Sequence, residues 1–179
     1  QAAESTPPRL QTGQIDLYQM HHVDRLTPID EIWQAMETLV QQGKIVYVGS
    51  SNFAAWHLAQ ANDAARQRHF MGIVSEQSLY NLKSRLVELE VIPACQHYGI
   101  GLIPWSPLAS GILGGSDYQS KAGHRESERQ IDATEKHRAQ LERYRAFCAE
   151  IDQKPAHGAL AWPPSKPAGW NSRARIGSR

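Results

Sequence analysis

Four short apolar segments, evenly spaced along the chain, constrain its fold more than any other feature. They are rich in β-branched residues, and their leading isoleucines are 27 to 30 residues apart; the segments are Ile15–Met20, Ile45–Val48, Ile73–Ser75 and Ile100–Trp105. The residues between them follow a helical pattern. Strands that alternate with helices at this interval indicate βαβ units in a parallel sheet. The spacing alone fits either a (β/α)₈ barrel or a doubly wound sheet.

The first intervening helix has the clearest boundaries. We expect Thr27 as its N-cap, Pro28 as its first residue and Asp30 as the source of a second capping bond. Gly43 is expected to follow its end in a left-handed conformation. One side of this helix is apolar and consists of Ile29, Ile32, Trp33, Met36, Leu39 and Val40.

Two further helices are predicted before the fourth strand. Asn52 is expected to cap a helix over about residues 54–67. Another covers about residues 87–97, where Pro93 marks either a kink or the true first turn, and Gly99 ends it.

The pattern changes after the fourth strand. Residues 111–129 are polar and contain glycines, which predicts a long loop. Residues 133–151 are predicted to form a charged helix whose apolar side carries Leu141, Tyr144, Phe147, Cys148 and Ile151. Residues 1–8 and 163–179 show no strand or helix pattern and are expected to be disordered. Residues 9–162 then form the folded domain.

The composition excludes several classes of protein. The 179 residues are 41% hydrophobic and 21% charged, as in ordinary globular proteins, and the net charge of +1 gives no sign of nucleic-acid binding. No apolar run reaches the roughly 18 residues of a membrane span, and residues 1–8 do not resemble a signal peptide. The two cysteines, Cys95 and Cys148, are expected to be reduced thiols of a cytoplasmic protein.

Polar residues follow each of the four apolar segments, where a parallel α/β fold places its active site. They lie within residues 21–24, 49–52, 76–77 and 105–108. Each also has a purely structural interpretation, since strand-end histidines often only pack, Ser-Asn pairs cap helices and a tryptophan is usually core. Their recurrence at four strand ends favours a ligand-binding rim.

Other kinds of site fit less well. His21 and His22 would point to opposite faces of a strand, so they do not form a metal site, and no metal ion is predicted. The chain has no Gly-x-Ser-x-Gly nucleophile elbow. It also has no Gly-x-Gly-x-x-Gly turn, which argues against a dinucleotide-binding doubly wound domain.

Four motifs at the strand ends resemble the aldo-keto reductase family. They are Ile-Asp-Leu-Tyr-Gln-Met-His (15–21), Gly-Lys-Ile-Val-Tyr-Val-Gly-Ser-Ser-Asn-Phe (43–53), Ser-Glu-Gln-Ser-Leu-Tyr-Asn (75–81) and Pro-Trp-Ser-Pro-Leu-Ala-Ser-Gly (104–111). The resemblance runs from about Arg9 to Trp162. The residues of these motifs are similar to those of a bacterial branch of the family that is related to potassium-channel β subunits. It implies an α/β fold of the (β/α)₈ TIM-barrel type, here a partial barrel of about four βα units followed by a long loop and a helix.

The resemblance also implies roles for individual residues. His21 matches the active-site histidine that orients the substrate carbonyl. Ser51, Asn52 and Gln77 match residues that bind the nicotinamide carboxamide, and Trp105 matches the aromatic residue that stacks on the nicotinamide ring. The loop that wraps the cofactor pyrophosphate is matched by Ser106, Leu108, Ser110 and Gly111. NADPH is the implied cofactor, and an aldehyde or ketone the implied substrate.

Several family motifs do not occur here. They are the Asp-Thr-Ala-x-x-Tyr-Gly segment with the catalytic tyrosine, the lysine that supports that tyrosine, and the Gly-Pro-Arg motif that binds the 2′-phosphate. We therefore expect an incomplete fragment of an NADP(H)-dependent carbonyl reductase that lacks the first three strands. The alternative is a non-catalytic cofactor-binding or regulatory fragment that resembles the channel β subunits. Open sheet edges are expected to cause self-association; no nucleic-acid or membrane partner is expected.

Overall fold

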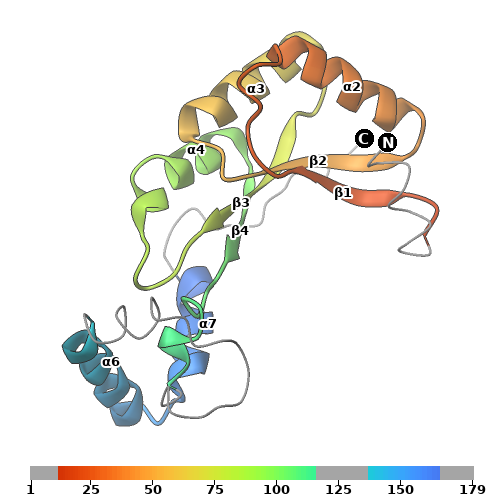
Figure 1. The fold of residues 1–179 in the computed structure, drawn as a ribbon. Helices are drawn as coiled ribbons and strands as arrows, with labels where there is room; N and C mark the ends of the chain where they lie inside the picture. The colour runs from red at the N-terminus through yellow and green to blue at the C-terminus, as the bar shows by residue number, and fades with distance from the viewer. Residues whose placement is uncertain (1–11, 116–136, 166–179) are drawn as a thin grey trace. The chain divides into compact units, whose positions relative to one another are not determined.

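The computed structural model describes residues 12–115 and 137–165, and it divides them into two compact units. The first unit contains residues 12–79 and 86–105, and the second contains residues 80–85, 106–115 and 137–165 (Figure 1). Much of the predicted loop over residues 111–129 and both predicted disordered ends, except residues 163–165, lie outside the described residues. No helix of the described residues is long and apolar enough to cross a membrane.

The first unit is built on a parallel sheet whose strand order is β1-β2-β3-β4. The strands are β1 (Ile15–Met20), β2 (Ile45–Ser51), β3 (Ile73–Leu79) and β4 (Gly101–Trp105). All four predicted strands are confirmed, but β2 and β3 extend beyond their apolar segments. Their polar ends remain in the sheet because Ser51 pairs with Gln77, and Gln77 in turn pairs with Ile103 of β4.

The strand order decides between the two folds that the spacing allowed. Each strand lies beside the next one in the sequence, without the reversal that defines a doubly wound sheet. Right-handed crossovers in one direction place every helix on the same face of the sheet. Helices α2 (Ile29–Gln41), α3 (Ala55–Gln67) and α4 (Val91–Tyr98) all cover that face (Figure 1). The fold is therefore the predicted α/β arrangement, part of a (β/α)₈ barrel.

The ends of these helices confirm the predicted glycines but not the predicted caps. Gly43 and Gly99 have φ angles of +66° and +71°, the left-handed conformation expected after a helix end. Thr27 does not cap α2, because its hydroxyl donates to Asp24 Oδ2 at 2.6 Å instead. Asn52 does not cap α3 either, since Ala54 precedes that helix and no side chain caps it. Pro93 lies in the first turn of α4, one of the two predicted alternatives.

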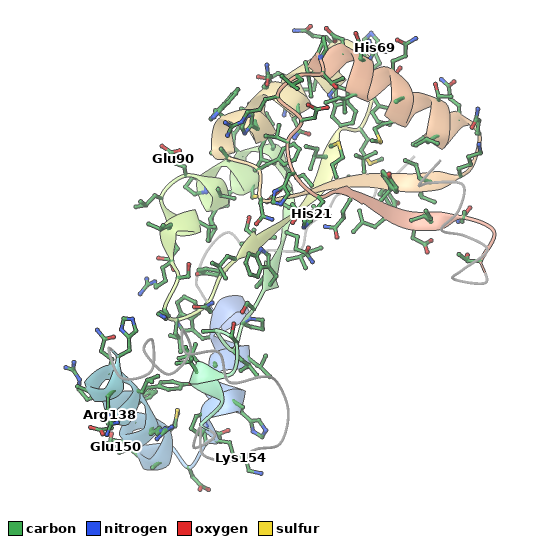
Figure 2. The ribbon with its side chains drawn as sticks, in the orientation of Figure 1. His21, His69, Glu90, Arg138, Glu150 and Lys154 are labelled. Carbon is green, nitrogen blue, oxygen red and sulfur yellow. The ribbon has the colours of Figure 1, made fainter. Side chains whose placement is uncertain are left out.

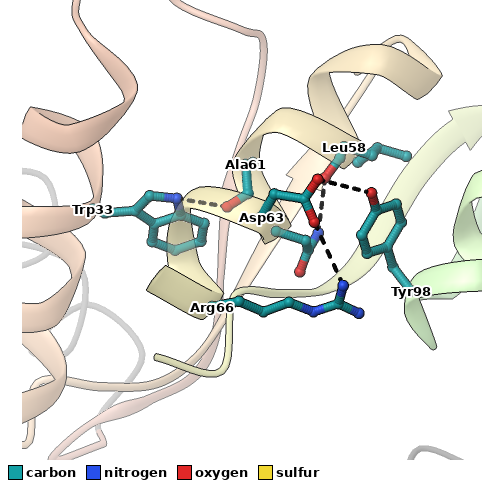
Figure 3. Close-up of polar contacts among 7 residues, drawn as sticks. Trp33, Leu58, Ala61, Asp63, Arg66 and Tyr98 are labelled. Atoms are coloured by element: carbon teal, nitrogen blue, oxygen red, sulfur yellow. Dashed lines mark hydrogen bonds and ion pairs between the residues drawn. The ribbon is translucent and has the colours of Figure 1, made fainter. Parts of the chain in front are cut away.

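A hydrophobic core lies between the sheet and the three helices. Trp33 of α2 is fully buried, and its indole N–H donates to the carbonyl of Ala61 in α3 at 2.8 Å. On the outer side of α3, Asp63 accepts hydrogen bonds from Arg66 and from the Tyr98 hydroxyl of α4 (Figure 3). The three helices are thus joined by polar contacts as well as by apolar packing. Core residues from helices and strands include Trp33, Ile45, Val48, Leu58, Ala61, Ala65, Ile73 and Cys95.

The second unit is smaller and has a separate core. It contains a short 3₁₀ turn (Ile112–Gly114) and the helices α6 (Arg138–Glu150) and α7 (Pro155–Ser165). Its buried apolar residues are Ile112, Leu113, Leu141 and Ala159.

Two predictions for the second unit need correction. Leu141 and Cys148 of α6 are buried as predicted, but Phe147 and Ile151 are exposed because little of the described chain covers that side. Helix α7 was not predicted, and it continues to Ser165 although we expected no regular structure from Pro163. Pro155 is the first residue of α7, where a helix has no acceptor for the N–H that proline lacks.

Candidate functional site

Four of the predicted site residues form one hydrogen-bonded group in the first unit, which we call the rim quartet: Ser51, Asn52, Gln77 and Trp105. The Ser51 hydroxyl donates to the Gln77 main-chain carbonyl at 3.0 Å. Asn52 Nδ2 donates to Ser51 Oγ at 3.3 Å, and the Trp105 indole N–H donates to Asn52 Oδ1 at 3.0 Å. The carboxyl ends of β2, β3 and β4 thus bring together residues that are distant in the sequence.

The turn after β2 places Asn52 for these contacts. Asn52 has a φ angle of +58°, in the left-handed region that asparagine tolerates better than most residues. Its main-chain N–H donates to the Gln77 carbonyl at 2.9 Å. The turn directs the side chain toward Trp105 instead of back toward α3, which is why Asn52 is not a helix cap.

The rim quartet combines buried and accessible groups. Ser51 is nearly fully buried, whereas Trp105 is 39% exposed and presents part of its ring to solvent. The side chains of Asn52 and Gln77 each offer an amide donor and an amide acceptor. Among the described residues, no acceptor is bonded to the Gln77 side-chain nitrogen. The group can therefore exchange internal hydrogen bonds for bonds to a planar amide ligand.

A second polar cluster involves Glu76 and Ser50, the residues directly before Gln77 and Ser51; both were among the polar residues noted at the strand ends, but neither was given a role. Glu76 of β3 is fully buried and accepts hydrogen bonds from the hydroxyls of Ser50 and Ser78, the latter at 2.7 Å. It also accepts the main-chain N–H of Phe53 at 3.1 Å. Burial raises the pKa of Glu76, and the hydrogen bonds from Ser50, Ser78, Phe53 and Asn52 act in the opposite direction.

One signal in the sequence could have found this cluster. A glutamate inside a strand that is buried by helices requires partners. Serines occur at the neighbouring position of β2 and two residues further along β3, on the same side of the strand. That pattern predicts a hydrogen-bonded carboxylate.

His21 is the first residue after β1 and is exposed (Figure 2). Its ring contacts the ring of His22, with centroids 4.2 Å apart and planes tilted by 57°. The expectation that these two side chains point to opposite faces is wrong, because β1 ends at Met20 and the alternation of a strand no longer applies. Met20 pairs with Ser50, so His21 lies at the same sheet edge as the rim quartet. No hydrogen bond joins the His21 ring to the quartet within the described residues.

The remaining predicted residues lie in the second unit, in a loop with an unusual backbone. Ser106, Ala109, Ser110 and Gly111 all have positive φ angles, between +49° and +94°. Three of these are not glycine, and such residues adopt the left-handed region at a cost of roughly 1–3 kcal/mol each. Leu108 lies in the same turn, where its carbonyl accepts the N–H groups of Gly111 and Leu113.

Internal hydrogen bonds hold this loop. The N–H groups of Ala109 and Gly111 donate to the carbonyls of Ser106 and Leu108, both at 2.9 Å. The N–H of Ser110 donates to Ser106 Oγ at 3.2 Å, and Asn81 Nδ2 donates to the Ser106 carbonyl at 2.9 Å. These bonds leave the hydroxyl protons of Ser106 and Ser110 able to donate to an anion. Like Glu76, Asn81 supports residues of the candidate site, and the sequence analysis gave it no role.

The described residues contain other polar features that the sequence did not assign to the site. A hollow of about 410 Å³ lies beside the first turns of α2 and α3, and none of the nine predicted site residues lines it. Buried His57 borders it, and burial lowers the pKa of His57. The described residues contain no group of three His, Cys, Asp or Glu side chains that could hold a metal ion. Cys95 and Cys148 are both free and buried.

Comparison with known proteins identifies the family. The model of the aldo/keto reductase family matches residues 1–170, which extends past Arg9–Trp162 at both ends. The chain belongs to the aldo/keto reductase family. It is 52% identical over 164 residues to the uncharacterized oxidoreductase YrpG of Bacillus subtilis (strain 168), a match that covers 92% of this chain and 50% of YrpG.

Two further relatives carry more specific names. Versiconal hemiacetal acetate reductase of Aspergillus parasiticus is 33% identical over 191 residues, covering 98% of this chain and 54% of that protein. Aflatoxin B1 aldehyde reductase member 2 of Homo sapiens is 36% identical over 121 residues, covering 67% of this chain and 34% of that protein. The chain thus spans about half the length of the first two relatives, and the resemblance seen in the sequence is confirmed at the level of the family.

Proposed function

We propose that this chain contributes the nicotinamide-binding part of an NADPH-dependent carbonyl reductase. The rim quartet is the observation that carries the proposal. A carboxamide has one donor and one acceptor group, and Asn52 and Gln77 offer both kinds of partner at one sheet edge. The half-exposed Trp105 ring beside them presents a flat surface on which an aromatic ring can stack.

For the second unit, the resemblance to the family gives a separate proposal about the loop of residues 106–111. The hydroxyls of Ser106 and Ser110 would bind the pyrophosphate, in the loop that Leu108 and Gly111 help to close. When bound, NADPH supplies the hydride that reduces the carbonyl. His21 would donate a hydrogen bond to the oxygen of an aldehyde or ketone and so orient it.

The reductase names of the relatives support the aldehyde or ketone as substrate class. Neither the Asp-Thr-Ala-x-x-Tyr-Gly segment nor the Gly-Pro-Arg motif occurs in the 179 residues. In the described residues, the hydroxyls of Tyr98 and Tyr144 already donate to Asp63 and to the Pro155 carbonyl. We therefore expect the chain alone to bind NADPH weakly, with little preference over NADH, and to show negligible turnover. Cofactor binding without catalysis is the second candidate function.

The test compares two polypeptides. One is the 179-residue chain, and the other is a chimera in which the parts of YrpG that this chain does not match are joined to it. We expect both to bind NADPH in a fluorescence titration and only the chimera to reduce an activated aldehyde. Loss of one hydrogen-bond donor to a reacting oxygen typically lowers kcat about 10²–10³-fold, so we expect His21→Ala to lower kcat in the chimera by about 10²-fold or more. Failure of both polypeptides to bind NADPH would contradict the proposed function.

Self-association is a further part of the proposal. In the described sheet, β1 and β4 each have a neighbouring strand on one side only. Unpaired strand edges bind other strand edges. We expect the 179-residue chain to form dimers or larger species in sedimentation velocity and the chimera to form fewer. A monomeric 179-residue chain with a sharp melting transition would exclude this. A cytoplasmic location of the protein stays a prediction, which we base on the two cysteines.

A further inference from the structure

The cluster around Glu76 connects buried parts of the fold to the candidate nicotinamide site. Glu76 lies in β3, one residue before Gln77 of the rim quartet. Its carboxylate accepts the hydroxyl of Ser50, which directly precedes Ser51, and the N–H of Phe53, which directly follows Asn52. One side chain thus holds the chain on both sides of the two residues that would bind the carboxamide.

We propose that Glu76 is a positioning residue of the nicotinamide site: its carboxylate fixes the turn from Ser50 to Phe53 and thereby orients Ser51 and Asn52 toward the cofactor. This inference rests on the proposed function for the identity of the ligand. The orientation itself is a property of the fold.

Three features of the geometry support this role. Glu76 is fully buried, so solvent does not compete for its hydrogen bonds. Its partners come from β2, from β3 and from the turn, and the N–H of Phe53 can only donate. Asn52 has a φ angle of +58°, a conformation that a non-glycine residue keeps only when its surroundings hold it.

The consequence reaches Trp105. Its indole N–H donates to Asn52 Oδ1 at 3.0 Å, so a shift of the turn would remove the acceptor of that bond. Loss of Glu76 should therefore loosen the whole rim quartet, although Glu76 itself contacts neither the exposed indole nor a bound cofactor. A residue that only adds to stability would not change the geometry of the rim quartet, whereas loss of Glu76 should do so.

The experiment uses three variants of the 179-residue chain. Glu76→Leu removes both carboxylate oxygens at similar volume, and Glu76→Gln keeps one acceptor for the Phe53 N–H. Ile45→Ala is the matched control, because Ile45 is buried in the core at the opposite end of β2. All three are expected to lower stability, so unfolding is measured for each and the comparison is made where every variant is folded.

Two readouts separate positioning from stability. Hydrogen exchange of the Phe53 amide should become about tenfold faster in Glu76→Leu than in Ile45→Ala, as expected for the loss of a buried hydrogen bond. Exchange of the Trp105 indole, which is partly exposed, should become faster in the same variant. NADPH affinity should fall about tenfold in Glu76→Leu, stay within about threefold in Ile45→Ala, and be largely restored in Glu76→Gln. In an Asn52→Ala background, Glu76→Leu should weaken binding further by less than about twofold, because both act through the same contact.

The outcomes distinguish this proposal from the proposed function. If the unaltered chain binds NADPH and Glu76→Leu binds it equally well, the positioning role is wrong and the function stands. If the unaltered chain does not bind NADPH but exchange at Phe53 and Trp105 still depends on Glu76, the function is wrong and the positioning of the turn stands. The same substitutions in the YrpG chimera provide both readouts if the 179-residue chain is too aggregated to measure, and equal exchange in Glu76→Leu and Ile45→Ala there would overturn the proposal.

Discussion

The rim quartet and the loop of residues 106–111 are held in different ways. In the rim quartet, side chains bond to side chains and to a neighbouring strand: Trp105 to Asn52, Asn52 to Ser51, and Ser51 to the Gln77 carbonyl. In the loop, most of the hydrogen bonds join main-chain groups of its own turns, with single bonds from Ser110 N–H to Ser106 Oγ and from Asn81 Nδ2 to the Ser106 carbonyl. The loop also contains left-handed conformations at Ser106, Ala109 and Ser110. We infer that the rim quartet depends mainly on which side chains are present, whereas the loop depends mainly on which backbone angles its residues permit.

Substitution of Asn52 tests this contrast with the largest expected effect. Asn52→Ala removes the side chain and also strains the backbone at a φ of +58°, whereas Asn52→Gly removes the side chain alone. If side-chain contacts dominate, both variants should bind NADPH about 10- to 100-fold more weakly, and they should differ from each other by less than about threefold. Titration of both variants by fluorescence gives the answer. If Asn52→Gly binds NADPH as tightly as the unaltered chain, the backbone angle at residue 52, and not its side chain, determines binding.

Substitution of Ser110 tests the loop. Here we expect a change in stability that is smaller in free energy than the largest effect of the Asn52 substitutions on binding. A β-branched valine is disfavoured at a φ of +57°, so Ser110→Val should lower the free energy of unfolding of this region by about 1–2 kcal/mol. Ser110→Gly relieves the strain and should leave stability unchanged or slightly raised. Denaturant unfolding, with hydrogen exchange over residues 106–113, measures both. An equal loss of stability in the two variants would show that the Ser110 side chain, and not the backbone angle, decides the stability of the loop.

Trp105→Phe sharpens the comparison with the smallest effect. Phenylalanine keeps an aromatic face for stacking but lacks the indole N–H that donates to Asn52 Oδ1. The loss of one partly exposed hydrogen bond, worth about 1 kcal/mol, should weaken NADPH binding roughly fivefold. A calorimetric titration measures this difference, with Trp56→Phe as the control because Trp56 is exposed on α3 outside the quartet. A loss of more than about a hundredfold would mean that the indole N–H does more than orient Asn52.

Local patterns predicted the positions of the strands and helices well. The four apolar segments are all strands, and Gly43 and Gly99 end the helices for which they were expected. Local patterns failed where a residue has a choice of partner. Thr27 and Asn52 are both good helix caps by type, yet each bonds elsewhere, to Asp24 and to Trp105. Capping preferences describe a helix end in isolation, and a stronger partner nearby can override them.

The sequence by itself determined the alternation of strands and helices and the family, and it named the residues that we propose for the site. Only the tertiary structure decided that the strands lie in consecutive order with their helices on one face, which distinguishes a barrel from a doubly wound sheet. It also decided that Glu76 holds the turn from Ser50 to Phe53 and that Asn52 meets Trp105, 53 residues further along the chain. The physical reason is that strand order and buried hydrogen bonds join residues that are distant in the sequence, and a local pattern reports only which groups need a partner.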